Sequence, residues 1–316
     1  MLRRSPPRFA QRSGYRRWRP KNVFLMQEII TKAGTLLEAL PYIQRFRSQI
    51  FVVKYGGSFM DSPDPSERHR VAREIVFLEA VGINPVVVHG GGKAVTRAVE
   101  AAGLKTTFLQ GQRVTDEATV QLVDDVLSRE INPEIVAAIE ELGGKARGFA
   151  GSEIFRCRKL SPNDQSGRPI DLGFVGEVYE VNVEPLRECI RRNITPVISP
   201  TARGEDGQIY NCNADIAAAQ TAIALRARRL VFMSDVPGLL RDPGDPHSLM
   251  SHLSASEVPA LKANGVVGEG MIPKVDSAVA AIQSGVEKVQ FVDGRVPHSV
   301  LLEIFTDAGV GTEVVL

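Results

Sequence analysis

Apolar residues along this chain alternate between short β-branched runs and stretches with helical spacing. The run from Ile50 to Tyr55 is followed by two glycines and a helical pattern, and the run from Pro85 to Val88 by three glycines and a helix from Lys93 to Ala102. Strand, glycine turn and helix in this order make a βα unit. Two successive units of this kind predict a parallel sheet in this part of the chain.

The alternation continues to the C-terminus. Further strands are predicted at Pro196 to Ser199, Leu230 to Met233 and Lys288 to Val292. Further helices are predicted at Asp116 to Leu142, with an interruption near Asn132-Pro133, and at Val183 to Arg192, Ala214 to Leu225, Ser254 to Asn264 and Val275 to Gln283. Turn-rich stretches predict inserted hairpins or loops at Gly143 to Gly151, Asn163 to Gly176 and Arg203 to Gly207. Together these patterns predict an α/β sandwich around a mainly parallel central sheet.

A helical pattern also precedes the first strand, at residues 26–48. Apolar residues recur at helical spacing from Met26 to about Arg47, and Pro41 is expected to kink or break the helix. The helix either packs on its own domain or reaches across to another subunit. After it we expect an N-lobe at residues 49–200 and a C-lobe at residues 201–316.

Residues 1–25 differ in kind from the rest of the chain. The first 21 positions contain eight lysines and arginines and no acidic residue, which predicts a disordered segment. Three interpretations stay open: an organelle transit peptide, a nucleic-acid-binding arm, or an extension without function ahead of a true start at Met26. We favour the extension, with a transit peptide next because the composition is arginine-rich and acid-poor.

Composition disfavours several classes of protein. The 316 residues are 43% hydrophobic and carry 38 Lys plus Arg against 37 Asp plus Glu, so the body of the protein has no bulk attraction for nucleic acid or membrane. No apolar run reaches the roughly 20 residues that span a bilayer. Cys157, Cys189 and Cys212 lack metal-ligand spacing and are expected to be structural, as in a reducing compartment. We expect a cytoplasmic protein, or an organelle protein if the first residues are a transit peptide.

Two glycine turns at strand ends are candidates for binding an anion. Lys54-Tyr55-Gly56-Gly57-Ser58 places a lysine and free backbone amides at the end of the first strand, where a phosphate can be held. His89-Gly90-Gly91-Gly92-Lys93 places three glycines at the start of a helix, whose unpaired amides favour negative charge. Neither motif matches the fingerprint of a P-loop or a Rossmann fold. His89 itself is expected to be a packed histidine.

Three polar motifs add candidate binding residues. Arg113, in Gly111-Gln112-Arg113-Val114-Thr115-Asp116, precedes a capped helix and suits bidentate capture of a carboxylate. Asn211-Cys212-Asn213-Ala214-Asp215 offers more polar side chains than a helix cap uses. A glycine-flexed loop, Gly268-Glu269-Gly270-Met271-Ile272-Pro273-Lys274, lies downstream of Ser234-Asp235-Val236-Pro237-Gly238-Leu239. Each motif alone is also compatible with ordinary surface residues.

In order and context, the five motifs resemble those of the acetylglutamate kinases of the amino-acid kinase superfamily, from about Gln27 to Leu316. The resemblance implies a three-layer αβα sandwich, whose N-terminal half binds N-acetyl-L-glutamate and whose C-terminal half binds ATP. Such an enzyme phosphorylates the side-chain carboxylate of N-acetyl-L-glutamate, an early step in arginine synthesis. The lysines and glycine turns are typical of the superfamily, whereas the pairing of the arginine and asparagine motifs narrows the substrate.

The resemblance also implies roles for individual residues. Lys54 and Lys274 would stabilise the transferring phosphoryl group, and Asp215 would position the two lysines. The acetylglutamate site would comprise Gly91, Gly92, Arg113 and Asn211, with Arg113 on the α-carboxylate. The nucleotide would be held by Gly56 and Gly57 at its phosphates and by Asp235, Gly238, Leu240, Val266 and Gly268.

The chemistry of this reaction requires no catalytic base. A side-chain carboxylate with a pKa near ~4.3 is already ionised at neutral pH. Transfer then needs alignment and charge neutralisation, which lysines, backbone amides and Mg²⁺ can supply. The sequence shows no carboxylate cage for a metal, so Mg²⁺ would be carried by the nucleotide phosphates and water.

Two segments resemble the arginine-inhibited branch of the family: the helix from Met26 and the stretch from Leu301 to Thr312. In that branch the helix interlaces dimers into a hexamer and L-arginine binds near it. Glu303 and Gly309 would then contact the effector. One departure bears on this expectation, because Gln290 replaces the histidine that this branch usually carries.

Three other functions are compatible with parts of this sequence. A kinase acting on acetylaminoadipate or a carrier-linked aminoadipate in lysine synthesis would keep the lysines and differ in pocket depth. A non-catalytic arginine-sensing domain is disfavoured by the presence of Lys54, Asp215 and Lys274 together. A nucleic-acid-binding function would rest only on residues 1–25.

Overall fold

The computed structural model describes residues 23–316 except positions 63, 165, 243, 269 and 308. The chain divides into two compact units, Met1–Pro41 and Tyr42–Leu316. The prediction of a disordered basic segment, with its three interpretations, falls mostly on residues 1–22 and so lies outside the described residues. Within the described part, no helix is long and apolar enough to cross a membrane.

Helix α1 (Val23–Phe46) continues across the division between the units. It begins at Val23 rather than at the predicted Met26, and it runs through Pro41 without the break that proline makes possible. Proline removes the hydrogen bond to the carbonyl of residue 37, but Leu37 and Pro41 are both exposed, so water can satisfy that carbonyl.

The central sheet of the second unit has eight strands, in the order β12-β14-β13-β11-β1-β2-β8-β5. β13 and β14 pair antiparallel, and the other neighbouring strands pair parallel. The strands are β1 (Ile50–Tyr55), β2 (Asn84–His89), β5 (Ala146–Phe149), β8 (Thr195–Ile198), β11 (Arg229–Ser234), β12 (His252–Ser254), β13 (Lys288–Asp293) and β14 (Thr312–Val315). The predicted α/β fold with a mainly parallel sheet is therefore confirmed.

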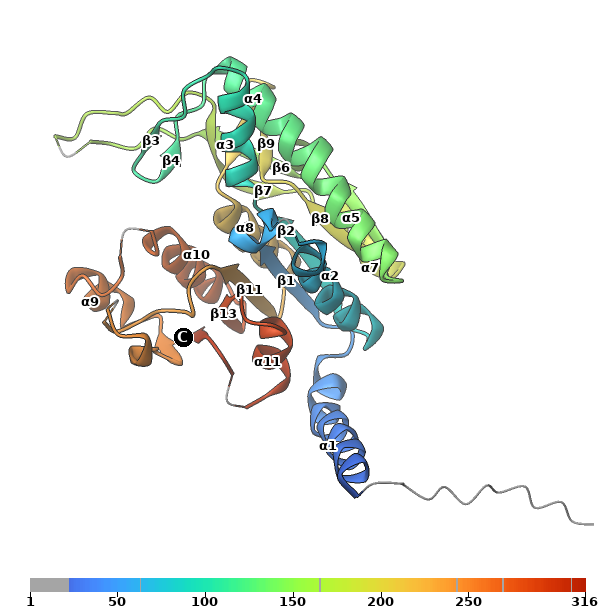
Figure 1. Ribbon diagram of the computed structural model, residues 1–316. Helices are drawn as coiled ribbons and strands as arrows, with labels where there is room; N and C mark the ends of the chain where they lie inside the picture. Colours follow the sequence, from blue (N-terminus) through green and yellow to red (C-terminus); the bar gives the residue numbers. More distant parts are fainter. Residues whose placement is uncertain (1–22, 63, 165, 243, 269, 308) are drawn as a thin grey trace, which may run out of the picture. The chain divides into compact units, whose positions relative to one another are not determined.

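Helices cover the sheet on both faces (Figure 1). α2 packs on β2 and on α5, whereas α8 packs on β1, β2 and β11 and on α10. The helices are α2 (Pro65–Ala80), α3 (Gly92–Ala101), α4 (Glu117–Asp124), α5 (Asn132–Glu141), α6 (Gly151–Ile154), α7 (Glu184–Arg191), α8 (Ala214–Leu225), α9 (Val258–Ala263), α10 (Ile272–Gln283) and α11 (Ser299–Phe305), with 3₁₀ turns η1 (Ser58–Asp61) and η3 (Pro246–Ser248). One large core cluster joins sheet residues such as Val52 and Phe232 to the alanine-rich α8.

A small closed barrel, in the order β10-β7-β6-β9, was not predicted as such. It comprises β6 (Phe155–Lys159), β7 (Val175–Val181), β9 (Thr201–Gly204) and β10 (Ile209–Cys212), and a separate hairpin joins β3 (Phe108–Leu109) to β4 (Gln112–Arg113). The turn-rich stretch Gly143 to Gly151 also differs from its prediction, because it contains β5, an edge strand of the main sheet whose middle residues are exposed. An edge strand of this kind has no apolar run for a sequence pattern to detect.

The predicted interruption near Asn132-Pro133 is wrong. The chain runs from α4 through a π-helical segment, η2 (Asp125–Ile131), directly into α5. Pro133 closely follows this π-helical segment, where wider turns already replace the i→i−4 hydrogen bonds that a proline interrupts. Asn132 is buried, and its Nδ2 donates to the carbonyl of Val197 over 3.0 Å and lies 3.2 Å from Nε2 of His89. Its side chain therefore ties the helix to the sheet.

Candidate active site

Two cavities lie at the carboxyl ends of β1, β2 and β11, where ligands bind in open α/β sheets. The larger has a volume of ≈ 710 Å³ and reaches from β1 to α3, α5 and β10, and the smaller has a volume of ≈ 390 Å³ and reaches toward α10. The two share the lining residues Lys54, Gly56, Gly57 and Asp235. The larger cavity belongs mainly to the N-terminal half of the unit, and the shared residues join it to the C-terminal half.

Asp215 lies between the two predicted lysines. Nζ of Lys54 is 3.1 Å from Oδ1 of Asp215, and Nζ of Lys274 contacts Oδ2 of the same carboxylate. Asp215 is 5% exposed and Lys54 8% exposed. Burial raises the pKa of Asp215, but the ammonium groups of Lys54 and Lys274 outweigh burial and hold the pKa below its ordinary value. The carboxylate is therefore ionised and fixes two cations at one point.

Each member of this cluster comes from the end of a regular element. Lys54 lies near the carboxyl end of β1, Asp215 in the first turn of α8, and Lys274 in the first turn of α10. α8 is capped by Asn213, whose side chain accepts hydrogen bonds from the backbone N–H of Asp215 at 2.8 Å and of Ile216 at 3.3 Å. A negative charge is favoured at a helix N-terminus, so the fold itself helps to hold Asp215 there.

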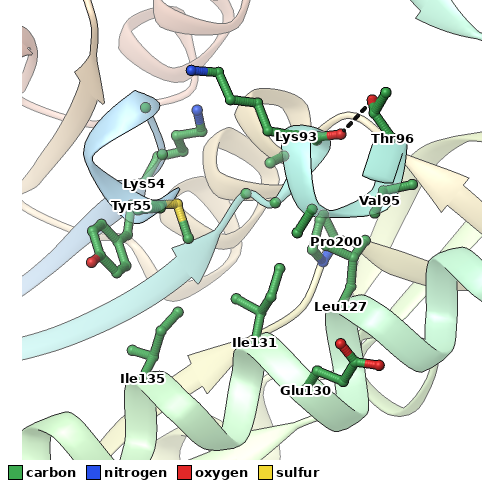
Figure 2. Close-up of a pocket in the computed structure, with 18 of the residues that line it drawn as sticks. Lys54, Tyr55, Lys93, Val95, Thr96, Leu127, Glu130, Ile131, Ile135 and Pro200 are labelled. Atoms are coloured by element: carbon green, nitrogen blue, oxygen red, sulfur yellow. Dashed lines mark hydrogen bonds between the residues drawn. The ribbon is translucent and has the colours of Figure 1, made fainter. Parts of the chain in front are cut away.

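The glycine turn after β2 leaves no space for a side chain. Gly91 has φ of 157°, and a Cβ atom there would lie 2.5 Å from Cδ1 of Ile131 and 2.6 Å from Cδ2 of Leu127. Figure 2 shows these two side chains pointing up from η2 toward the turn, with Ile135 of α5 beside them. The backbone of the turn therefore faces the cavity directly, as the predicted anion cradle requires.

Asp235 links the two halves of the site. Its carboxylate accepts hydrogen bonds from the backbone N–H of Ser58, at 2.7 and 2.9 Å, and from the Ser58 hydroxyl at 2.8 Å. Ser58 follows Gly56 and Gly57, so Asp235, at the end of β11, holds the glycine turn that follows β1. The family resemblance implied a role for Asp235, but sequence reasoning did not identify Ser58 as its partner.

Arg113 is fixed against the start of α3. Its Nη2 donates to the carbonyl of Gly92 over 3.0 Å and to the hydroxyl of Thr96 over 2.8 Å, and its Nη1 donates to the hydroxyl of Thr106 over 3.2 Å. The ring of Phe108 covers one face of the guanidinium, with its centroid 4.8 Å from Cζ. Phe108 is 54% exposed and lines the cavity, so it contributes little to the core. Sequence reasoning missed Phe108, although two adjacent large apolar residues, Phe108 and Leu109, ahead of a polar turn were a signal.

Of two other residues singled out from the sequence, Asn211 lines the larger cavity and His89 is buried. Asn211 lines the larger cavity and donates from Nδ2 to the hydroxyl of Thr115 over 3.4 Å. His89 is fully buried, and burial lowers its pKa to about 4, so its ring is neutral at physiological pH. The expectation of a packed histidine is confirmed. Cys157, Cys189 and Cys212 are buried and unbridged, as expected of structural cysteines.

The structure does not bring every predicted nucleotide residue to the cavities. Gly268 lines the smaller cavity with Asp235, but Gly238, Leu240 and Val266 line neither. Gly238 packs instead against β14: its φ is 148°, and a Cβ atom would meet Leu249 and Thr312. The backbone N–H of Leu239 donates to the Thr312 hydroxyl over 2.8 Å. Gly238 and Leu240 therefore belong to the loop after β11, and Val266, whose backbone N–H donates to the carbonyl of Leu261 over 3.0 Å, belongs to the loop after α9.

The predicted effector residues Glu303 and Gly309 line neither cavity and contact each other and neighbouring residues. The Glu303 carboxylate accepts hydrogen bonds from the backbone N–H of Val310 at 2.7 Å and of Gly311 at 3.0 Å, and from Nε2 of Gln290 at 2.9 Å. Gly309 has φ of 61°, and a Cβ atom there would lie 2.9 Å from Oε2 of Glu303. Gln290 therefore takes part in these contacts itself.

The described residues offer no group of three or more histidine, cysteine, aspartate or glutamate side chains that could hold a metal ion. Of the carboxylates that line the cavities among the described residues, Asp215 is neutralised by two lysines and Asp235 holds Ser58, whereas Glu130 and Glu134 lie on η2 and α5 and form no metal-ligating group with them. A resident Mg²⁺ cage built from protein side chains does not fit this donor set.

With the fold and the site in view, comparison with known proteins identifies the class. The family model described as the amino acid kinase family matches residues 49–293, and the chain belongs to this family. As a member of a kinase family, it uses ATP.

The particular relatives are named acetylglutamate kinases. The one from Heliobacterium modesticaldum is 46% identical over 295 residues, which cover 92% of this chain and 99% of the relative. The one from Aquifex aeolicus is 45% identical over 302 residues, covering 92% of this chain and 100% of the relative. The chain therefore groups with the acetylglutamate kinases, which confirms the predicted family and reaction. The relatives give no support to the aminoadipate kinase or to the non-catalytic domain.

Solved structures agree on the fold. N-acetylglutamate synthase from Neisseria gonorrhoeae, complexed with coenzyme A and N-acetyl-glutamate, is 25% identical with a TM-score of 0.78, over 90% of this chain and 63% of the synthase chain. The present chain thus spans less than two thirds of that protein. Carbamate kinase from Giardia lamblia bound to AMP-PNP has a TM-score of 0.60 at 15% identity, over 84% of this chain and 98% of the kinase, and supports the fold alone.

Proposed function

We propose that this protein transfers the γ-phosphoryl group of ATP to the side-chain carboxylate of N-acetyl-L-glutamate in arginine biosynthesis, at the cavity between Lys54, Asp215 and Arg113. The observation that carries the proposal is the buried cluster in which one carboxylate holds two ammonium groups at the junction of two cavities. A reaction between two anions requires such a concentration of positive charge.

The roles of the residues follow from their positions. In the larger cavity, Arg113, Asn211 and the amides of Gly91 and Gly92 would hold acetylglutamate, with the Arg113 guanidinium on its α-carboxylate. In the smaller cavity, Gly56, Gly57, Gly268 and Asp235 would hold the nucleotide. In this proposal the N-lobe at residues 49–200 supplies most of the amino-acid site and the C-lobe at 201–316 most of the ATP site. Asn211 and the turn at Gly56 and Gly57 are the exceptions.

Transfer proceeds without proton abstraction by the protein. The ionised side-chain carboxylate attacks the γ-phosphorus, the bond to the bridging oxygen breaks, and its electron pair leaves with ADP. Lys54 and Lys274 offset the charge that spreads over the phosphoryl oxygens, and Asp215 keeps both ammonium groups aimed at that point. Gly238 and Leu240, in the loop after β11, and Val266, in the loop after α9, would hold the nucleotide only indirectly, since none of them lines either cavity.

Mg²⁺ would arrive with the nucleotide. The side chains around the cavities supply no cage for it, as described above, so phosphate oxygens and water would provide its ligands. When bound, it would neutralise part of the charge on the phosphates.

The test is ADP formation by the purified protein from Mg-ATP with each of four acids: N-acetyl-L-glutamate, L-glutamate, L-aspartate and N-acetyl-L-aminoadipate. Strong dependence on N-acetyl-L-glutamate is expected, because the arginine and asparagine sites bind an acylated amino acid. Turnover with N-acetyl-L-aminoadipate in its place would keep the fold and overturn the substrate.

We further propose a cytoplasmic homohexamer inhibited by L-arginine. The first unit exposes Ile29, Ile30, Leu36, Leu37 and Leu40 along α1, an apolar face suited to another subunit. Glu303 and Gly309 would bind the effector, and Glu303 would exchange its bonds to the loop at 310–311 for the arginine guanidinium. An N-acetylglutamate synthase of related fold has been solved with L-arginine. Unchanged activity at saturating L-arginine would reject the inhibition.

A further inference from the structure

Lys93 has no role in the arrangement described so far, although it lines the larger cavity together with Lys54 and Asp215. It is the second residue of α3, directly after Gly92. Figure 2 shows its side chain extending from the start of α3 over the cavity, toward the side on which Lys54 lies. The Lys93 side chain therefore extends toward Lys54, one of the two lysines that Asp215 holds.

The position is unfavourable for a lysine within the helix itself. The first turn of an α-helix carries partial positive charge, and the first turn of α3 contains no acidic residue to offset a cation. Within the part of the chain that the structure describes, Nζ of Lys93 forms no hydrogen bond or ion pair. A cation placed where the helix disfavours it, with no carboxylate to offset its charge, is expected mainly at functional sites. Lys93 is such a cation.

The charges around the cavity leave room for this cation. Asp215 cancels one of the two positive charges of Lys54 and Lys274. The larger cavity is lined by the acidic residues Glu130, Glu134, Asp215 and Asp235 and by the cations Lys54, Lys93, Arg97 and Arg113, so with Lys93 included these charges balance. The two reacting groups, a carboxylate and a phosphoryl group, are both anions and must come into contact.

We propose that Lys93 contacts the terminal phosphoryl group of bound ATP from the amino-acid side and acts as a third cation of the transfer. This inference rests on the proposed function. As the carboxylate oxygen bonds to the γ-phosphorus and the bridging oxygen leaves with ADP, the Lys93 ammonium offsets charge on the phosphoryl oxygens and keeps its own protons. It complements Lys274, which approaches from the nucleotide side.

Nucleotide binding without acetylglutamate tests the contact first. The dissociation constants of ADP and of the non-hydrolysable analogue β,γ-imido-ATP are measured by calorimetry, with Mg²⁺, for the wild type and for Lys93→Gln. Affinity for the imido analogue should fall about 10-fold or more in the variant, and affinity for ADP should change less than about twofold, because ADP lacks the contacted group. Lys93→Arg should keep the preference for the triphosphate.

Turnover provides the second readout. With acetylglutamate, Lys93→Gln should lower kcat/KM for ATP by about 10- to 100-fold. Lys105→Gln is the matched control, since Lys105 is exposed and lines neither cavity, and it should behave as wild type. The unfolding temperature of Lys93→Gln should equal or exceed that of the wild type, because the variant removes an unfavourable charge from the helix start.

Equal losses of affinity for ADP and the imido analogue, or turnover within about twofold of the wild type, would overturn the role of Lys93. A wild type that does not turn over acetylglutamate would instead count against the proposed function. The binding comparison would still report on Lys93, so the two failures are distinguishable.

Discussion

Individual side chains of this site are each held in place by several hydrogen bonds or ion pairs within the protein. Arg113 donates to Gly92, Thr96 and Thr106 within the protein itself. Asp215 is similarly fixed by two lysines and by the capped start of α8. Such fixed side chains lose little conformational entropy when a ligand binds, which favours catalysis by positioning.

Arg113→Lys is expected to raise KM for N-acetyl-L-glutamate by about 10- to 100-fold and to leave KM for ATP within about twofold. A lysine carries the charge but cannot reproduce the planar fork that reaches three acceptors at once. Steady-state kinetics with each substrate varied separately gives both constants. Arg191→Lys serves as control, because Arg191 forms exposed ion pairs on α7. A rise confined to KM for ATP would contradict the placement of Arg113.

At the scale of elements, α2 and α11 are joined by a buried glutamate. Oε2 of Glu74 accepts the backbone N–H of Val300 over 3.1 Å at the start of α11, and Oε1 lies 4.0 Å from Nδ1 of His298. Glu74 is 2% exposed, and burial raises its pKa to about 7 from an ordinary 4.5, against the opposing effects of Arg70 and of the amides that it accepts. The rings of Phe77 and Phe305 meet beside it, 5.7 Å apart.

This raised pKa makes stability depend on pH. Between about pH 4.5 and 7 the folded protein keeps a proton on Glu74 that the unfolded chain releases, so the free energy of unfolding should fall as pH rises through this window, by at most about 3 kcal/mol. Glu74→Gln cannot ionise and lacks this fall. Its stability relative to the wild type should therefore increase from pH 5 to pH 8.

Urea unfolding at the two pH values measures the difference. The exposed Glu140→Gln on α5 is the control, and its difference from the wild type should stay within about 0.5 kcal/mol at both pH values. A Glu74→Gln variant whose relative stability is the same at pH 5 and pH 8 would show that Glu74 is ionised throughout.

Sequence patterns predicted the central elements well and the peripheral ones poorly. β1 and α8 have the predicted bounds, because each is a continuous apolar or alanine-rich run buried on both sides. The barrel strand β6 and the edge strand β5 contain arginines and exposed positions, so no periodicity marks them. The helix around Asn132 was predicted to break because asparagine and proline usually end helices, whereas here the amide bonds to the sheet.

For the candidate site, the sequence predicted several of the residues but not the contacts between them. The motifs and the family resemblance pointed to Lys54, Asp215 and Lys274, which the fold brings together from segments far apart in the chain. Contacts such as Ser58 with Asp235 or Phe108 with Arg113 were not predictable, since they join loops whose relative placement only the folded chain defines. Gly238 was assigned to the nucleotide but packs against Thr312.

At the scale of the whole molecule, the two units suggest separate tasks. The second unit contains both cavities and every proposed catalytic residue. The first unit carries the exposed apolar face of α1. Assembly and catalysis are therefore expected to be separable by deletion.

A chain that lacks residues 1–41 should keep acetylglutamate kinase activity and form a smaller assembly than the full chain. The deletion ends where the units divide, so Tyr42, which bonds to Asp307, and the buried Phe46 remain. Light scattering coupled to size-exclusion chromatography measures the mass. Leu37→Glu in the full chain is the matched test, since it places a charge in the apolar face. A deletion variant that still forms a hexamer would refute the role of α1.

The central claim is that the paired lysines on Asp215 transfer phosphate to a carboxylate, and trapping the product tests it most directly. Hydroxylamine converts an acyl phosphate into a hydroxamate, which is measured in reactions of Mg-ATP and N-acetyl-L-glutamate. The wild type and the surface control Lys262→Ala, which removes an ion pair with Asp276, should form hydroxamate at similar rates. Lys274→Ala and Asp215→Asn should be slower by about 10²- to 10³-fold. Hydroxamate formed at the wild-type rate by Lys274→Ala, or ADP formed without any hydroxamate, would contradict the account.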